Sequence, residues 1–195
     1  MKISYSPSEF LKNCWSLFCT KLFFRPARLV RRPIYIRGKK GIKFGEGFTT
    51  GYRCRFDIFG LKQDDVKLKL GKNCKIGDNV HFVASENVIV GDDCLMASNI
   101  FISDTNHGSN EDPSKIPPDK RPLTSCPVTI GNNVWIGEGV CILPGAKIGD
   151  GCIVGAHSIV KGEIPPYTVV VGAPAKVVKK YNFDKLVILT TFFFS

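Results

Sequence analysis

The sequence predicts an all-β solenoid in which the chain winds as a parallel β-helix. Between Ile130 and Pro165, one six-residue phrase is repeated six times without a break. An aliphatic residue opens every phrase, Gly follows it in four phrases, and the fifth position is usually small or β-branched. A hexapeptide period is the sequence signature of a parallel β-helix. A β-sandwich, the alternative, would alternate every two residues between turns about 8–12 residues apart.

Steric packing explains this period. If three phrases make one turn of roughly 18 residues, the aliphatic side chains stack over one another at the strand spacing of about 4.8 Å. The corners of each coil must bend sharply, which favours Gly, Asn and Asp. Each coil buries the open face of its neighbour, so we expect the stability of the fold to come from stacking.

Residues 1–40 are predicted to form an amphipathic and basic N-terminal segment. Within it, the stretch from about Ser8 to Phe24 has the pattern of an amphipathic helix that Pro26 ends. This helix is too short to span a bilayer comfortably. It either packs on the side or end of the β-helix or attaches peripherally to an anionic membrane, because four arginines follow it closely: Arg25, Arg28, Arg31 and Arg32.

Residues 41–180 are predicted to form the repeat domain, which one long segment interrupts. Degenerate coils begin near Gly41, and the pattern stops after Phe101. Residues 103–129 are polar and rich in Pro. A long loop that breaks a repeat is usually functional or disordered, so we expect this one to protrude and to carry the active site. The apolar tail, residues 181–195, is expected to cap the open end of the prism, with contact to lipid as the alternative.

The composition limits the classes of protein and of partner. A chain of 195 residues that is 44% hydrophobic can bury the core of one domain. The 27 Lys and Arg residues against 17 Asp and Glu give a net charge of +10, which predicts attraction to anions. The sequence contains no pattern of a recognition helix, a base-stacking aromatic sheet or a zinc finger, so nucleic acid is not expected as a partner.

The eight cysteines are explained by the repeat. Cys74, Cys94 and Cys152 each occupy the fifth hexapeptide position, where small core residues are needed. No Cys-x-x-Cys pair is present to bind a metal or to carry out redox chemistry, and no cleavable signal sequence opens the chain. We therefore expect no metal site, and a reducing cytoplasm as the location.

His107 is the candidate catalytic residue. It lies in the segment Ser-Asp-Thr-Asn-His-Gly at residues 103–108, at the start of the interrupting loop. Imidazole is the side chain best suited to take a proton from a hydroxyl near neutral pH. His81 and His157 lie within coils and are expected to be structural or exposed.

At these residues the chain resembles the hexapeptide-repeat acyltransferases with a left-handed β-helix. The strongest matches are residues 130–137, with the sequence Ile-Gly-Asn-Asn-Val-Trp-Ile-Gly, and the pair Pro165-Pro166 followed by residues 171–176, Val-Gly-Ala-Pro-Ala-Lys. These motifs are similar to those of galactoside and maltose acetyltransferases. The Asp-x-Asn-His-Gly loop is closer to bacterial O-antigen and capsule O-acetyltransferases. The resemblance covers about residues 41–181.

The resemblance implies a homotrimer in which acetyl-CoA lies in a groove between neighbouring prisms. His107 would remove the proton of the acceptor hydroxyl, which would attack the thioester directly, without a covalent acetyl-enzyme. Asp104 or a main-chain carbonyl would orient His107. Asn106 and Asn99 match acceptor-binding positions, although Asn99 has the alternative of being a coil-corner residue.

The resemblance also implies a set of cofactor contacts. Trp135 would pack on the pantetheine arm or the acceptor, main-chain amides near Gly137 and Glu138 would stabilise the developing oxyanion, and a small residue at Ala156 would let pantetheine approach. Two lysines complete the set, Lys161 and Lys176, of which Lys176 would meet a phosphate of CoA. Many relatives have Thr-Lys where this chain has Lys161-Gly162, which puts that contact in doubt.

The predicted function is acetyl-CoA-dependent O-acetylation of a sugar. The chain lacks the N-terminal helical cap of the maltose acetyltransferases, which favours a surface-polysaccharide acceptor, O-antigen or capsule, at the inner face of the cytoplasmic membrane. A γ-class carbonic anhydrase would need three converging histidines, two of them close in sequence. The chain has only His81, His107 and His157, with no close pair, so this class is not expected. A non-catalytic scaffold would need neither His107 nor Trp135. Two alternatives share the scaffold and stay open, namely N-acylation of an amino sugar and acetylation of an antibiotic.

Overall fold

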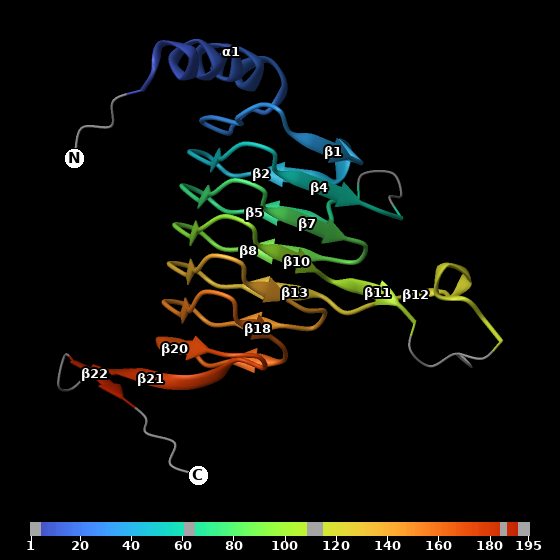
Figure 1. The fold of residues 1–195 in the computed structure, drawn as a ribbon, viewed down its shortest axis with the longest axis vertical. Helices are drawn as coiled ribbons and strands as arrows, with labels where there is room; N and C mark the ends of the chain where they lie inside the picture. The colour runs from blue at the N-terminus through green and yellow to red at the C-terminus, as the bar shows by residue number, and fades with distance from the viewer. Residues whose placement is uncertain (1–4, 61–64, 109–114, 184–186, 191–195) are drawn as a thin grey trace.

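The computed structural model describes residues 5–60, 65–108, 115–183 and 187–190, the last four by their backbone alone. The body of the molecule is a triangular prism built from three parallel sheets, along which the coils follow one another from the N-terminal to the C-terminal end (Figure 1). We name these sheets A, B and C. The three-sheet prism is typical of the left-handed parallel β-helix and confirms the predicted fold class.

The strands are short, as the hexapeptide period requires. Sheet A contains β3 (Thr49–Thr50), β6 (Lys75–Ile76), β9 (Leu95–Met96), β14 (Trp135–Ile136), β17 (Ile153–Val154), β20 (Thr168–Val171), β21 (Lys176–Asn182) and β22 (Val187–Thr190). Sheet B contains β1 (Tyr35–Arg37), β4 (Arg55–Ile58), β7 (His81–Ala84), β10 (Phe101–Ser103), β15 (Cys141–Ile142) and β18 (Ile159–Val160). Sheet C contains β2 (Ile42–Phe44), β5 (Leu68–Leu70), β8 (Val88–Val90), β13 (Val128–Ile130), β16 (Lys147–Ile148) and β19 (Glu163–Ile164).

The interior of the prism contains aligned aliphatic side chains. In sheet C, for example, Leu70, Val90 and Ile130 are register partners, and each is at most 3% exposed. The predicted core cysteines, Cys74, Cys94 and Cys152, are buried between these columns. A further buried cysteine, Cys54, lies in an earlier coil, where burial raises the pKa of its thiol to about 11.

Asn and Asp residues bend the coils at the corners. Asn79, Asn99 and Asn133 adopt left-handed backbone conformations with φ between 55° and 59°. Their short polar side chains tolerate this conformation and can bond to the neighbouring coil. The Nδ2 of Asn79, for instance, donates to the Oδ1 of Asn99 over 3.0 Å. Hydrogen bonds therefore connect successive coils at the corners as well as along the strands.

The ends of the chain extend the prism. Helix α1 (Pro7–Phe23) begins at a capping box in which the Ser6 hydroxyl and the Glu9 carboxylate bond reciprocally to backbone amides. It lies across the N-terminal end of the prism (Figure 1). Strand β1 pairs with β4, so the first coil already begins within residues 1–40. At the other end β21 pairs antiparallel with β20. Of the tail predicted as a cap, residues 184–186 and 191–195 lie outside the described part of the chain.

The predicted protruding loop contains regular structure. Strands β11 (Thr105–His107) and β12 (Leu123–Ser125) pair antiparallel. A short 3-10 helix (Pro118–Lys120) lies between them in the sequence, shortly before β12. Another 3-10 helix (Lys39–Gly41) leads into the first strand of sheet C. Together β11 and β12 form a ribbon that projects from the side of the prism (Figure 1).

Candidate functional site

The ribbon formed by β11 and β12 carries His107. It replaces the ordinary corner between β10 of sheet B and β13 of sheet C. His107 is opposite Leu123 in the register, and the Gly108 N–H donates to the Pro122 carbonyl over 3.0 Å. The imidazole is exposed. The paired strands thus hold the side chain away from the prism, where a partner molecule can reach it.

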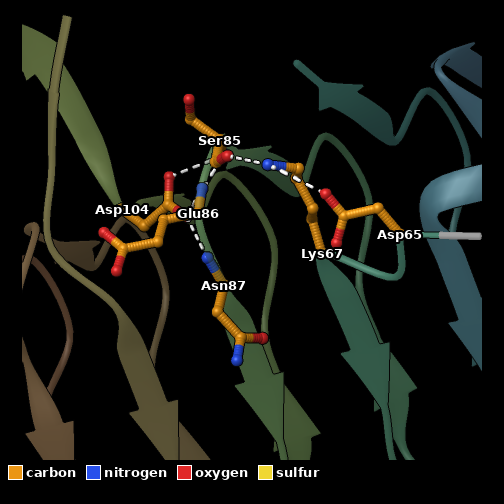
Figure 2. Close-up of polar contacts among 6 residues, drawn as sticks. All are labelled: Asp65, Lys67, Ser85, Glu86, Asn87 and Asp104. Carbon is orange, nitrogen blue, oxygen red and sulfur yellow. Dashed lines mark hydrogen bonds and ion pairs between the residues drawn. The ribbon is translucent and has the colours of Figure 1, made fainter. Parts of the chain in front are cut away.

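Asp104 holds the base of this ribbon. Its carboxylate is completely buried and accepts hydrogen bonds from the N–H groups of Ser85, Glu86 and Asn87, the shortest at 2.8 Å (Figure 2). Its main-chain carbonyl accepts from Cys126 over 2.7 Å. Because these groups face the prism, the expectation that Asp104 orients His107 is not supported. The residue instead anchors both strands of the ribbon.

A lysine fixes the opposite side of the turn that Asp104 binds. The Nζ of Lys67 donates to the Ser85 carbonyl over 2.5 Å and is 3.3 Å from the Asp65 carboxylate (Figure 2). The turn at residues 85–87 is therefore held through its amides and through a carbonyl. No sequence pattern predicts this arrangement, since Lys67 precedes Asp104 by almost two coils.

Four of the six predicted cofactor residues, Trp135, Gly137, Glu138 and Ala156, lie at or beside the corner between sheets A and B. Trp135 stands on β14 with 52% of its surface exposed. Gly137 follows, and a Cβ placed on it would lie 2.7 Å from the Ala156 backbone nitrogen of the next coil. Only Gly fits this close approach. Because Ala156 is exposed and has a small side chain, the surface beside Trp135 stays open.

Main-chain amides at this corner are capped from coil to coil. The Tyr52 N–H donates to the Asp78 carboxylate, the Asp78 N–H to the Ser98 hydroxyl, and the Ser98 N–H to the Glu138 carboxylate, over 2.7, 3.0 and 2.9 Å. The residue that would cap Glu138 in the next coil is Ala156, which has no acceptor. Within the described residues, the Glu138 N–H has no hydrogen-bond partner.

Asn99 and Glu138 contact each other at the same corner. The Asn99 Nδ2 lies 2.5 Å from the Glu138 Oε1, and the Asn99 Oδ1 accepts from Asn79. Asn99 is therefore placed as a coil-corner residue, the alternative that the sequence allowed. The Glu138 side chain has the same structural role. One group at this corner that can bind a ligand is the main-chain N–H of Glu138.

The two lysines lie on different corners. Lys161 is exposed between β18 and β19, at the corner from which the His107 ribbon leaves in an earlier coil. Lys176 is exposed at the start of β21, directly after Ala175, whose N–H donates to the Ile159 carbonyl. Lys176 thus lies near the end of the corner that carries Ala156.

The candidate residues of one chain occupy the two long edges of sheet B. The edge toward sheet A has Gly137, Glu138 and Ala156, with Trp135 beside it, and the edge toward sheet C has the ribbon with Asn106 and His107. Between them the outer face of sheet B is apolar in its later coils, where Phe101, Cys141 and Ile159 are register partners. One chain alone does not bring the two groups together.

His81 belongs to a polar cluster on an earlier part of sheet B. Its Nε2 lies 3.1 Å from the Asp57 carboxylate, which also accepts from Arg55 over 2.6 Å. Burial acts to raise the pKa of Asp57, but the hydrogen bonds from Arg55 and His81 and the nearby charges outweigh it, and the pKa is lowered. This agrees with a structural His81. No group of metal-ligating side chains occurs among the described residues.

Two family models match the repeat. One describes the bacterial transferase hexapeptide with six repeats and matches residues 127–162, and the other describes the hexapeptide repeat of succinyl-transferases and matches residues 67–104. A relative from Escherichia coli K12, named "Putative lipopolysaccharide biosynthesis O-acetyl transferase WbbJ", is 44% identical over 185 residues, which are 92% of each chain.

Solved structures have the same fold. A galactoside acetyltransferase in complex with coenzyme A matches with a TM-score of 0.59 at 25% identity, over 94% of this chain and 87% of that chain. AntD, an N-acyltransferase from Bacillus cereus, matches with a TM-score of 0.70 at 20% identity, over 95% and 94% of the two chains. At that identity the likeness to AntD concerns the fold alone.

Replacing Asp104 with Ala is expected to loosen the ribbon base. Three N–H groups lose the carboxylate that accepts from them, and a hydrogen bond to a charged group contributes about 1.5–3 kcal/mol, so the free energy of unfolding should fall by about 3 kcal/mol or more. Hydrogen exchange at Ser85, Glu86 and Asn87 should accelerate strongly. Asp119→Ala, an exposed change in the 3-10 helix of the same protruding segment, is the control. Unchanged exchange at the three amides would contradict the anchoring role.

Proposed function

The chain belongs to the hexapeptide-repeat acetyltransferase family, and on this basis we propose that it transfers an acetyl group from acetyl-CoA to a hydroxyl of a sugar in a surface polysaccharide. The family membership supports an acyl-CoA-dependent enzyme. The observation that carries the site is the Glu138 N–H, which has no hydrogen-bond partner among the residues that the structure describes and lies near exposed Trp135 and small Ala156. The relationship to WbbJ supports a lipopolysaccharide or related glycan as the acceptor.

A homotrimer would complete the active site. If three chains close a ring with sheet B of each facing the axis, the edge that carries His107 in one chain lies beside the edge that carries Glu138 in the next. The apolar side chains of Phe101 and Ile159, which are 36% and 37% exposed in one chain, would be covered in such a ring. Each active site would then take its base from one chain and its cofactor groove from another.

The residues then divide the chemistry between them. His107 removes the proton of the acceptor hydroxyl while that oxygen bonds to the thioester carbonyl carbon. The Glu138 N–H donates to the carbonyl oxygen, on which negative charge develops. As the carbon–sulfur bond breaks, His107 returns its proton to the departing sulfur. The products are the sugar ester and the free thiol of CoA, and no residue of the chain is acetylated.

Other side chains would position the two substrates. Trp135 packs against the pantetheine arm, and Ala156 lets the arm approach the coil. Lys161 and Lys176 supply positive charge for the phosphates of CoA. We assign Asn106, next to His107 on the ribbon, to the sugar, and we do not assign Asn99, which bonds to Asn79 and Glu138 at the coil corner. Because acetyl-CoA is the donor, we place the reaction in the cytoplasm.

Replacement of His107 tests the general base. In His107→Ala, acceptor-dependent release of CoA thiol should fall by roughly 10²-fold or more, because the hydroxyl loses its proton acceptor, while acetyl-CoA binds as before. The acceptor panel contains glycan repeat units, simple sugars and amino sugars. Lys120→Ala, an exposed change in the 3-10 helix of the same protruding segment, is the control. Full turnover in His107→Ala would refute the assignment, and turnover with amino sugars alone would replace O-acetylation with N-acylation.

The substitution Ala156→Ser tests the role of the Glu138 amide. A Ser hydroxyl at this place should cap the Glu138 N–H as Ser98 caps that of Asp78. Since the amide is then occupied, kcat should fall by about 10²-fold, in the range seen when an oxyanion donor is removed. Ser98→Ala is the matched control, which should lower stability and leave kcat near the native value. An unchanged kcat in Ala156→Ser would exclude the amide as oxyanion donor.

Mixed trimers test whether neighbouring chains share the site. His107→Ala and Ala156→Trp chains should each be inactive alone, the latter because the indole fills the cofactor groove. After random reassortment in equal amounts, about three quarters of the trimers are mixed, each with one native site of three, which gives about a quarter of native activity. A site contained in one chain would give no recovery. Light scattering should confirm the trimer in each sample.

A further inference from the structure

Helix α1 has its apolar side chains on the outside. Six large ones are between 55% and 68% exposed: Phe10, Leu11, Trp15, Phe18, Leu22 and Phe23. Leu11, Trp15, Phe18 and Leu22 follow one another at spacings of three and four residues, which places these four on one side of the helix. Trp15 and Phe18 stack on each other with ring centroids 5.7 Å apart. A helix that merely covered the end of a core would turn this face inward.

The inner side of α1 is polar for a physical reason. The first coil has no preceding coil to bond to, so its backbone and side chains need other partners. The Thr20 hydroxyl accepts from the Val30 N–H over 2.8 Å, and the Ser16 hydroxyl accepts from the Arg32 N–H over 3.2 Å. Asn13 accepts from the Arg31 side chain over 3.1 Å. This polar seam attaches the helix and leaves the apolar face without a partner in the described chain.

Positive charge surrounds the apolar face. Residues 5–40 contain nine Lys and Arg and a single acidic residue, Glu9. Five of the basic side chains are exposed on or close to the helix: Lys12, Lys21, Arg25, Arg28 and Arg32. No helix in the described residues is long and apolar enough to cross a membrane. A short apolar face with flanking basic residues is the pattern of a helix that lies in the plane of an anionic bilayer surface.

We propose that α1 is a docking helix that inserts its apolar face into the surface of an anionic lipid bilayer, so that the prism stands on the membrane by its N-terminal end. Charge complementarity favours this occupant over a second copy of the chain, which carries the same positive charge. In a trimer with parallel prisms the three helices would lie at the same end, and their contributions to the affinity for the membrane would combine.

The position of the ribbon agrees with an acceptor held at that surface. Three strand spacings separate β1 from β10, which is about 14 Å from the first coil to the base of the His107 ribbon. A saccharide linked to a membrane lipid could extend over this distance. This consequence rests on the proposed acetyltransferase function, whereas membrane docking itself does not.

Vesicle cosedimentation tests the docking. The full chain should bind vesicles of phosphatidylglycerol and phosphatidylcholine, and bind vesicles of phosphatidylcholine alone much more weakly. Leu11→Gln/Phe18→Gln keeps the net charge and should weaken binding at least tenfold. Arg25→Gln/Arg28→Gln should weaken it by roughly fivefold for each charge removed. Leu95→Gln, which alters an equally exposed apolar residue on sheet A, should bind as the native chain does.

Trp15 reports directly on insertion. In a Trp135→Phe background Trp15 is the remaining tryptophan. Its emission should shift to shorter wavelength on anionic vesicles, and lipids brominated near the headgroup end of the acyl chain should quench it. An unshifted emission, or native binding by Leu11→Gln/Phe18→Gln, would reduce the interaction to charge alone and overturn the proposal.

The remaining outcome concerns a protein partner. If Leu11→Gln/Phe18→Gln changes the oligomeric state in light scattering and leaves vesicle binding unchanged, the apolar face is an interface between copies of the chain and the proposal is wrong. Thiol release with a water-soluble acceptor separates the two hypotheses. Normal turnover without vesicle binding would refute docking alone, and vesicle binding without turnover on any acceptor would refute the proposed function alone.

Discussion

The structure depends on hydrogen bonds between main-chain groups and the next coil. The backbone of each coil can satisfy its polar groups only against its neighbours, because the interior is filled by apolar side chains. At the strands the ladder is backbone to backbone. At the corner between sheets A and B, side chains continue the ladder by accepting from main-chain N–H groups of the coil before. The corner between sheets C and A does the same: the N–H of Lys72 donates to the Asp92 side chain, that of Asp92 to Asn132, and that of Asn132 to Asp150. This requirement explains both the regular corners and the places where the chain departs from them.

The departures coincide with the candidate site. The corner between sheets A and B keeps its ladder as far as Glu138 and then meets Ala156, which has no acceptor to offer. The corner between sheets B and C is replaced by the ribbon, whose exit from the prism requires the buried Asp104 carboxylate to satisfy three amides at residues 85–87. At the edge between sheets A and B, the ladder lacks the hydrogen bond from the Glu138 N–H, which a substrate can replace. At the edge between sheets B and C, the Asp104 carboxylate adds hydrogen bonds that anchor the ribbon.

The hexapeptide pattern was enough to predict the prism, the burial of Cys74, Cys94 and Cys152, and the protruding segment that contains His107. All of these follow from local spacing. The role of Asp104 could not be predicted, because three residues of separation from His107 suggest contact, while its carboxylate binds a turn that lies almost twenty residues earlier. The Glu138 N–H, which has no partner in the described part of the chain, could not be predicted either, since its bonding depends on which residue of the next coil lies above it. The contacts of Asp104 and Glu138 depend on which residues of the adjacent coils lie above and below them, and not on their neighbours in the sequence.

The backbone polar groups at the two ends of the prism also need hydrogen-bond partners. An end coil has an open edge of backbone groups, and at the C-terminal end β21 covers this edge by antiparallel pairing with β20. At the N-terminal end α1 covers it with Ser16 and Thr20, polar residues that a helix normally directs toward water. An amphipathic helix has only two sides, so once the polar side satisfies the edge, the apolar side must face outward. The exposed aromatic face of α1 is thus a direct consequence of how the first coil is terminated, and the basic residues around it determine which kind of surface it can meet.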